Sequence, residues 1–276
     1  MIPENLVETD EYKQLCEILD NEYGVSVGES DRAIVEAKIK RYYERHGFDS
    51  LSECLAFIRS DGARLKELGE VVYSPSTHFN RQPRHFRFMT EKLAQERAEN
   101  SASPAPTKIW CLGCSTGQEA YTAAIYLREF MFSDVTGAGE FSVVGSDCSP
   151  NSLQQAQAGS YAIEDIERLR PLNFARYFSS IREGRASVGD DIKSRVTFTY
   201  FNLTTSEYLP TAFDFIFLRN ALDFHHLRSK LAILKNVRSA LRPGGYLILG
   251  DCPTLGGDVV CSTGYEWLES GCYKVV

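Results

Sequence analysis

The first third of the chain carries apolar residues at helical spacing. From Asp10 to Tyr23 they recur close to every 3.6 residues, which indicates an amphipathic helix. Three further helices are predicted from caps and apolar stripes: Ser30 or Asp31 to about His46, Ser50 through Ile58, and Arg64 to Val71. No strand pattern occurs here, so this part is predicted to be a small helical bundle.

Strands and helices alternate in the rest of the chain. A connector over 75–87, a helix over 91–99 and a polar linker over 100–107 come first. The predicted strands are 108–112, 141–145, 195–202, 213–218 and 246–249, and the predicted helices are 119–132, 149–158 and 227–241, the last closed by Pro243-Gly244-Gly245. Such alternation predicts a doubly wound α/β domain, with a parallel sheet between helices on both faces.

These patterns divide the chain into parts. Its 276 residues suffice for one large domain, or for a small domain and a medium one. We expect an N-terminal helical domain over 1–75, a connector over 76–107 and the α/β domain over 108–276.

Composition and charge narrow the class of function. A formal net charge of -7 disfavours a general nucleic-acid binder, which needs basic surface. The chain starts without a basic stretch before an apolar run, and no apolar run approaches the roughly 18 residues of a membrane span, so we expect neither signal peptide nor membrane insertion. The eight scattered cysteines fit reduced thiols, and we expect a cytoplasmic protein.

The residues that carry chemistry follow the predicted strands. Ligands of doubly wound sheets bind beyond the carboxyl ends of the strands. The first strand leads into a turn with Gly113 and Gly117, where small residues let a ligand approach the backbone. The second strand ends at Asp147, which can accept hydrogen bonds from two ribose hydroxyls, and the fourth ends near Asn220. The sequence therefore predicts a nucleoside-containing ligand at this edge.

A dinucleotide is the obvious competing ligand. Its site uses Gly-x-Gly-x-x-Gly to seat a pyrophosphate at a helix start. Here the turn has only Gly113 and Gly117, and Gln118-Glu119 opens the helix, where a carboxylate would repel a pyrophosphate. That carboxylate suits an ammonium group, such as the methionine end of S-adenosylmethionine. These features alone leave a second interpretation, an α/β domain that binds a different ligand.

Several motifs, in order, resemble the chemotaxis receptor methyltransferases of the CheR family. The turn G-C-S-T-G-Q-E-A-Y (113–121) is similar to that family's signature. The other similar segments are G-F-D-S-L-S-E-C-L (47–55), S-T-H-F-N-R (76–81), the second-strand region 145–161, F-N-L (201–203), F-L-R-N-A-L-D-F (217–224) and L-R-P-G-G-Y-L (241–247). The resemblance covers nearly the whole chain.

The resemblance implies methyl transfer from S-adenosylmethionine to glutamate side chains of chemoreceptor helices, giving glutamyl methyl esters and S-adenosylhomocysteine. The chemistry needs little acid-base machinery, because a glutamate with a reference pKa of about 4.3 is already ionised near neutral pH. What remains for the enzyme is proximity, in-line orientation and exclusion of water.

The resemblance also implies roles for individual residues. Arg81 matches the family's arginine near the transferred methyl, and its guanidinium can orient a carboxylate with two hydrogen bonds. Asp147 should hold the ribose, and Glu119 should contact either the methionine moiety or a group that shapes the cofactor site. The other implied cofactor-binding residues are Thr77 beside Arg81, Gly113 in the turn, Asn202 and Leu203 near the adenine, and Asn220 and Ala221 lining the pocket.

The chain departs from the family pattern mainly on the substrate side. Asn80 replaces an aromatic residue, Gln118 a glutamate, Ala120 a proline, and Phe224 stands where the family tends to show a tyrosine. An alternative function is therefore a CheR-like regulatory or scaffold protein that binds S-adenosylmethionine with weak or no catalysis. A small-molecule methyltransferase is the third reading, and a helical docking domain argues against it.

Two further features concern partners. Three basic residues share one face of the second helix: Lys38, Arg41 and Arg45. This face is either an ordinary solvated surface or a docking strip for a glutamate-rich receptor helix. The resemblance places a small β-subdomain at about 175–200. Some family members grip a receptor's C-terminal peptide there, but the stretch 179–191 is short beside theirs, and we expect no peptide tether.

One cysteine pair has the spacing of a reactive site. Cys111 and Cys114 form Cys-x-x-Cys, but Cys111 falls in a predicted buried strand. No second pair or suitable histidine cluster accompanies them, so we expect no metal site and no redox function.

Overall fold

The computed structural model describes most of the chain. The described ranges are 9–23, 29–73, 77–99, 105–133, 139–167, 176–223, 225–250, 255–269 and 271–276. None of the helices in these ranges combines the length and the apolar character that a membrane crossing needs.

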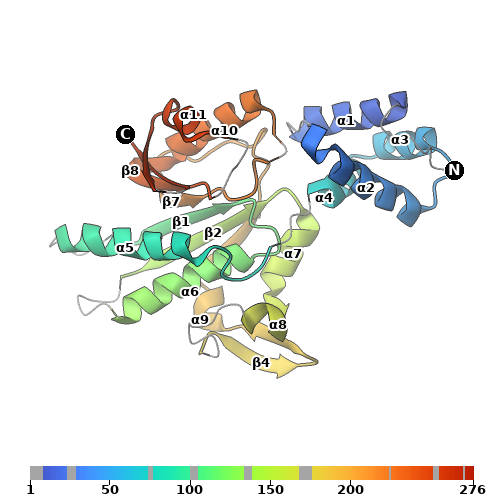
Figure 1. The fold of residues 1–276 in the computed structure, drawn as a ribbon. Helices are drawn as coiled ribbons and strands as arrows, with labels where there is room; N and C mark the ends of the chain where they lie inside the picture. The colour runs from blue at the N-terminus through green and yellow to red at the C-terminus, as the bar shows by residue number, and fades with distance from the viewer. Residues whose placement is uncertain are drawn as a thin grey trace.

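The N-terminal part is a bundle of helices, as predicted (Figure 1). The helices are α1 (Asp10–Tyr23), α2 (Glu29–His46), α3 (Leu51–Ser60) and α4 (Gly62–Tyr73). Their buried side chains, among them Leu15, Ile39 and Leu68, form one core of their own. Ser50 caps α3 by accepting a hydrogen bond from the Glu53 backbone at 3.1 Å. The α2 helix begins before Ser30, so the cap predicted at Ser30 or Asp31 is wrong.

A seven-stranded sheet with the order β6-β2-β1-β7-β8-β10-β9 organises the rest of the chain. The strands are β1 (Thr107–Leu112), β2 (Phe141–Asp147), β6 (Val196–Tyr200), β7 (Phe213–Phe217), β8 (Leu241–Ile248), β9 (Tyr265–Glu269) and β10 (Cys272–Val275). The pairs among β6, β2, β1, β7 and β8 are parallel, and β10 is antiparallel to both of its neighbours. The doubly wound α/β class is confirmed.

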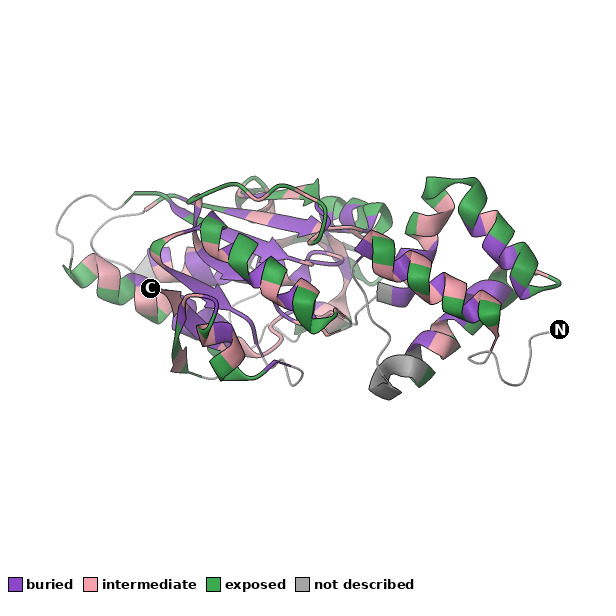
Figure 2. Ribbon diagram, turned by 90° about the horizontal axis from the view of Figure 1, so that it is seen from above, coloured by how far each residue is buried: buried purple, intermediate pink, exposed green. Residues whose placement is uncertain are grey.

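Helices cover both faces of this sheet (Figure 1). They are α5 (Pro83–Glu99), α6 (Gln118–Ser133), α7 (Pro150–Ala158), α10 (Leu227–Ala240) and α11 (Gly257–Cys261). Alternate residues of β1 enter two separate cores: Ile109 and Cys111 pack with residues of α5 and α6, and Trp110 packs with residues of α10. Figure 2 shows that the strands between the two helical layers are mostly buried.

Two boundaries differ from the prediction. The α5 helix starts at Pro83, although Pro75–Arg87 was predicted to be a connector and the helix to start at residue 91. Proline is well suited to the first turn of a helix, and Phe86 and Met89 in the added turns are buried. β8 starts at Leu241 and not at the predicted residue 246, because Leu241 already pairs with Phe213. The register of this pairing then shifts across residues 242–245, the predicted helix-closing turn.

A second, three-stranded sheet lies beside the main domain, in the order β3-β5-β4. It consists of β3 (Ser160–Ala162), β4 (Phe178–Arg182) and β5 (Arg185–Val188), which pair antiparallel, with the short helices α8 (Ile163–Ile166) and α9 (Asp190–Lys193) next to them. We refer to β3, β4 and β5 together as the small sheet. The subdomain expected at about 175–200 is present, but it begins at β3, and Val196–Tyr200 belongs to the main sheet.

Candidate functional site

The site is built on the turn between β1 and α6. Gly113 and Gly117 have φ angles of 72° and 93°, in the left-handed region that favours glycine. A Cβ on Gly113 would lie 2.9 Å from the Cβ of Ala221, and one on Gly117 would lie 2.8 Å from the Cβ of Ala156. Any larger residue would therefore push this turn away from its neighbours, which explains both glycines.

Asp147, at the end of β2, ties this turn to the next helix. Its Oδ2 accepts a hydrogen bond from the Ser115 backbone at 2.8 Å, and its Oδ1 accepts one from the Ser149 backbone at 2.9 Å. The carboxylate thus holds two loops at the edge where doubly wound sheets bind their ligands.

Five of the predicted site residues meet in one cavity of about 20 Å³. They are Thr77, Arg81, Gly113, Glu119 and Asn220. His78, Phe86, Cys114, Ser115 and Arg219 complete the lining. A volume of this size holds about one water molecule, whereas small-molecule sites span about 300–1,000 Å³. The side chains around it therefore have to move before a cofactor can enter.

Arg219 is the main site residue that the sequence prediction missed. It follows β7, and only 4% of its surface is exposed. Its Nη1 lies 3.2 Å from Oε2 of Glu119, and its Nη2 donates to the Arg81 carbonyl and to Oε1 of Gln82. The signal in the sequence was an arginine directly after a continuous apolar strand, because a buried charge requires a partner.

Glu119 is a buried acidic group. Its side chain is 14% exposed, and burial raises the pKa of its carboxyl, while the guanidinium groups of Arg219 and Arg81 oppose that shift. The cavity thus holds a carboxylate against a buried cation.

This pair fits the methionine end of S-adenosylmethionine. An amino-acid zwitterion carries an ammonium, which Glu119 can bind, and a carboxylate, which Arg219 can bind. Within the described part of the chain, the buried Nε of Arg219 has no hydrogen-bond partner. Asp147 stands at the end of the neighbouring strand, where a ribose is bound in such folds. The donors and acceptors present therefore match those of the cofactor.

Asn202 and Leu203 do not line this cavity. Asn202 is 3% exposed, its Oδ1 accepts from the Thr204 backbone at 2.9 Å, and its Nδ2 donates to the Glu22 carbonyl of α1 at 3.2 Å. Nε2 of His226 lies 3.0 Å from Oδ1 of Asp20 across the same junction. In this structure Asn202 connects the helical bundle to the α/β domain.

Three of the residues that depart from the family pattern make local contacts in the structure. Asn80 has a φ of 56°, which asparagine tolerates better than an aromatic residue, and its Oδ1 accepts a hydrogen bond from the Tyr126 hydroxyl at 3.0 Å. The Oε1 of Gln118 accepts from the Thr116 hydroxyl at 2.7 Å, and Ala120 is fully buried. Phe224 lies outside the described residues.

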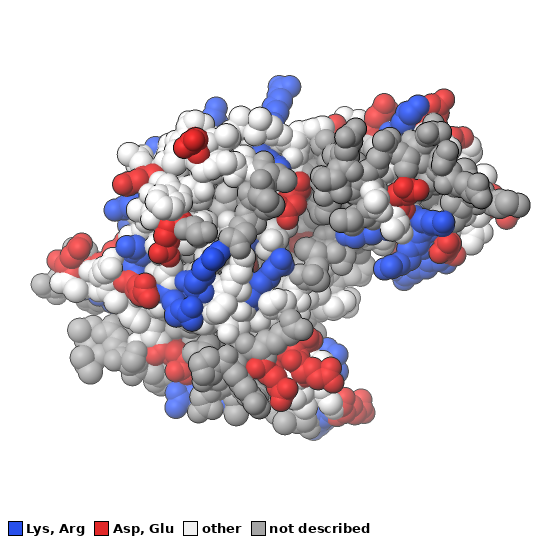
Figure 3. Space-filling model, viewed as in Figure 1, with Lys and Arg blue, Asp and Glu red and all other residues white. Residues whose placement is uncertain are grey.

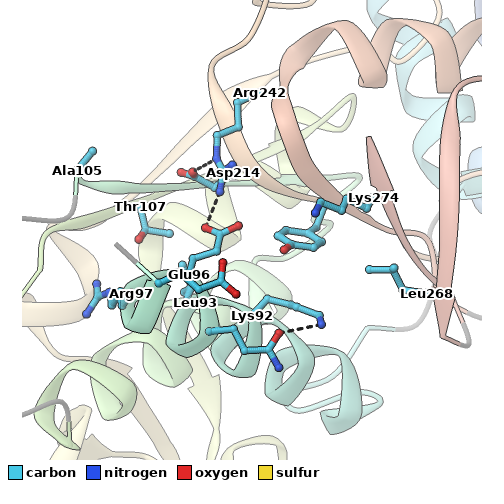
Figure 4. Close-up of a pocket in the computed structure, with 13 residues that line it drawn as sticks. Lys92, Leu93, Glu96, Arg97, Ala105, Thr107, Asp214, Arg242, Leu268 and Lys274 are labelled. Atoms are coloured by element: carbon cyan, nitrogen blue, oxygen red, sulfur yellow. Dashed lines mark hydrogen bonds and ion pairs between the residues drawn. The ribbon is translucent and has the colours of Figure 1, made fainter. Parts of the chain in front are cut away.

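A larger cavity, of about 710 Å³, lies at the opposite ends of the strands (Figure 4). Thr107 at the start of β1 lines it, together with Asp214 and Arg242 near the starts of β7 and β8. The guanidinium of Arg242 binds Asp214 and Glu96 at 2.6 Å each, which joins α5 to the sheet. Ligands of this fold bind at the carboxyl ends of the strands, so the smaller cavity is the candidate cofactor site.

The Cys111 and Cys114 side chains are both buried, and burial raises the pKa of each thiol well above its ordinary value. Thiols in this state are poor nucleophiles and poor metal ligands.

The chain matches two family descriptions that together cover most of its length. "CheR methyltransferase, SAM binding domain" matches residues 75–265, and "CheR methyltransferase, all-alpha domain" matches residues 10–72. The chain is 30% identical to "Chemotaxis protein methyltransferase Cher2" of Pseudomonas putida, over 90% of this chain and 91% of that protein. It is 24% identical to "Chemotaxis protein methyltransferase" of Borreliella burgdorferi, over 97% of this chain and 95% of that protein.

The order of domains in those descriptions agrees with the structure, in which a helical bundle precedes an α/β domain whose cofactor turn follows β1. The family description matches more than half of the chain, and one relative is 30% identical over nine tenths of it. Similarity of this extent indicates shared ancestry and not only a shared fold. The chain belongs to the CheR methyltransferase family, whose domain binds S-adenosylmethionine.

Proposed function

We propose that this protein transfers the methyl group of S-adenosylmethionine to glutamate side chains of chemoreceptors, giving glutamyl methyl esters and S-adenosylhomocysteine. Family membership over most of the chain supports the reaction class. The observation that carries the proposal is that Arg81 lines the same cavity as the Glu119–Arg219 pair.

The cofactor supplies an electrophilic methyl group, so the protein's own task is placement. The substrate glutamate is ionised near neutral pH and needs no general base. The Arg81 guanidinium is proposed to bind that carboxylate with two hydrogen bonds and to point one oxygen at the reacting centre. Thr77 and Asn220 line the same cavity and help exclude water from it.

The remaining site residues are assigned to cofactor binding. Asp147 is proposed to hold the ribose hydroxyls, Glu119 the ammonium and Arg219 the carboxylate of the methionine moiety. Gly113 and Ala221 keep the turn close to the loop after β7. Asn202 and Leu203 are proposed to lie near the adenine. The hydrogen bond from Asn202 to α1 holds the loop that carries both residues.

Receptor docking is proposed for the exposed basic residues of α2. Figure 3 shows Lys and Arg side chains gathered along the lower edge of the helical bundle. Arg41 and Arg45 are exposed, and so is Lys40. Lys38, the third residue of the predicted strip, donates from Nζ to the Val72 carbonyl of α4 at 2.8 Å and is half-buried, so we assign docking to Arg41 and Arg45.

Reversing both charges, as Arg41→Glu with Arg45→Glu, is expected to raise KM for the receptor about tenfold, because two exposed pairs that contribute about 0.7 kcal/mol each add up to about 1.4 kcal/mol. The kcat and the affinity for S-adenosylhomocysteine should not change. The matched control is Arg228→Glu with Lys235→Glu, two exposed positions of α10. Equal effects of both double variants on KM would contradict docking through α2.

The function is tested by incubating the protein with S-adenosylmethionine labelled on its methyl group and a chemoreceptor signalling fragment. We expect label on the fragment that is released as methanol by mild base, as a glutamyl ester requires. A fragment with its methylation-site glutamates replaced by alanine is the control. Cofactor binding without label on any receptor would overturn the proposal and favour a binding protein without catalysis.

The raised pKa of Glu119 predicts how cofactor binding depends on pH. An ammonium favours the ionised carboxylate, so binding lowers that pKa and releases a proton when the pH is below it. Affinity for S-adenosylhomocysteine should fall with acidification, starting above the pH at which an ordinary glutamate titrates. The limiting slope is about tenfold per pH unit. Calorimetry checks this, and a Glu119→Gln variant with the same acid slope as the wild type would refute the assignment.

A further inference from the structure

We propose that the small sheet positions the methyl-transfer site: Phe178 and Tyr161 hold Phe79, and through it Arg81, while Tyr161 also holds the cofactor turn. The part that concerns Arg81 rests on the proposed function. The part that concerns the turn rests only on cofactor binding.

Phe79 is the contact between the small sheet and the segment that carries Arg81. Its side chain is fully buried, although it lies between the half-buried His78 and Asn80. The Tyr161 ring of β3 meets it edge to face at 4.8 Å between centroids and 85° between planes. The Phe178 ring of β4 does so at 5.7 Å and 83°. These are favourable aromatic geometries, and together they define where the Phe79 ring lies.

The backbone on either side of Arg81 needs such support. Asn80 and Gln82 have φ angles of 56° and 54°, a region that residues other than glycine rarely occupy. Two strained residues around one arginine persist only where the surroundings hold them in place. On the α6 side, the Thr122 hydroxyl accepts a hydrogen bond from the Asn80 backbone at 3.2 Å. The small sheet supplies further support through Phe79.

Tyr161 also reaches the cofactor turn. Its hydroxyl donates to the Thr116 carbonyl at 2.6 Å, and it lies 3.0 Å from where a Cβ on Gly117 would be. Tyr161 itself is 4% exposed, and this hydrogen bond is partly buried. One residue of the small sheet thus contacts both the turn of the proposed cofactor site and the segment of the proposed substrate arginine.

The small sheet therefore has a task within the enzyme whether or not it binds a receptor peptide. Phe178 and Tyr161 are positioning residues, because both act through Phe79 or the Thr116 carbonyl and neither lines the cavity. Loss of the Phe178 ring should loosen Arg81, and loss of the Tyr161 hydroxyl should loosen the cofactor turn.

The first test compares Phe178→Ala with Ile192→Ala in the full-length protein. Ile192 is fully buried in α9, outside the small sheet, so its truncation controls for lost stability. We expect Phe178→Ala to lower kcat about tenfold, with KM for the receptor and affinity for S-adenosylhomocysteine within about twofold of the wild type. Amide hydrogen exchange of the 77–82 segment should become faster in this variant alone. Phe178→Tyr, which keeps the ring, should restore both kcat and slow exchange.

The second test is Tyr161→Phe, which keeps the ring on Phe79 and removes the hydroxyl. We expect affinity for S-adenosylhomocysteine to fall about fivefold, because one buried hydrogen bond is lost, while kcat at saturating cofactor stays near the wild-type value. Phe178→Ala should therefore lower kcat, whereas Tyr161→Phe should lower cofactor affinity.

Several outcomes would overturn the inference. Unchanged kcat and unchanged exchange in a folded Phe178→Ala protein would do so, and so would equal losses of kcat in Phe178→Ala and Ile192→Ala. Unchanged cofactor affinity in Tyr161→Phe would refute the part that concerns the turn. If the wild type methylates no receptor, the proposed function fails, but hydrogen exchange and cofactor affinity still decide whether the small sheet positions these two segments.

Discussion

Replacing Asp147 with alanine is expected to weaken binding of S-adenosylhomocysteine about 100-fold, a loss of roughly 3 kcal/mol. The carboxylate has two tasks that alanine cannot perform. It accepts hydrogen bonds from the Ser115 and Ser149 backbones, which shapes the turn, and it is assigned to the ribose hydroxyls. Hydrogen bonds to a charged group contribute about 1.5–3 kcal/mol each, so the loss of even part of this set explains the magnitude.

Calorimetric titration of S-adenosylhomocysteine measures this effect. Asp147→Asn is the informative companion, because its side-chain oxygen can still accept one of the two backbone hydrogen bonds, and we expect a loss of about tenfold. An Asp147→Ala protein that binds like the wild type would remove Asp147 from the cofactor site. A wild type that does not bind the ligand would show that this chain has lost the cofactor function of its family.

Replacing Arg81 with alanine is expected to lower kcat by about 100-fold, the loss expected when a reacting group is misplaced by about 1 Å. The substrate carboxylate would then reach the cavity without the two hydrogen bonds that aim it. Affinity for S-adenosylhomocysteine should change little, because Glu119, Arg219 and Asp147 carry the assigned cofactor contacts.

Steady-state kinetics with a receptor fragment tests this second effect. Arg81→Lys keeps the charge but not the planar pair of donors, so most of the kcat loss should remain. Arg87→Ala, on the exposed side of α5, is the matched control and should leave kcat unchanged. A lysine variant with full activity would show that Arg81 supplies charge alone, and an active alanine variant would exclude Arg81 from the chemistry.

Much of the candidate site could be predicted from the sequence because its parts lie in short local motifs. The turn from Gly113 to Gly117 requires left-handed backbone, and both φ angles are positive. The motif around Arg81 and the turn, far apart in the chain, line one cavity. Arg219 was missed because its importance depends on Glu119, a partner from another strand-helix unit, and no local pattern shows that pairing.

The same division holds for the fold. The α1 and α3 helices were predicted because each has an apolar stripe and a clear start or end. The small sheet and the β9–β10 hairpin were harder, since strands of three to five residues are too short for a periodic pattern. The segment 75–87 was predicted to be a connector, whereas α5 starts at Pro83, because a proline is compatible both with a connector and with the first turn of a helix.

The sequence by itself determined the α/β class, the helical bundle before it, and the residue types at the ends of the strands. It did so because periodicity and turn chemistry are local properties of the chain. Only the tertiary structure decided that Arg219 faces Glu119, that Lys38 binds the end of α4, and that Asn202 reaches α1. Those outcomes depend on which charges and polar groups are buried together, and burial is known only when distant segments have packed.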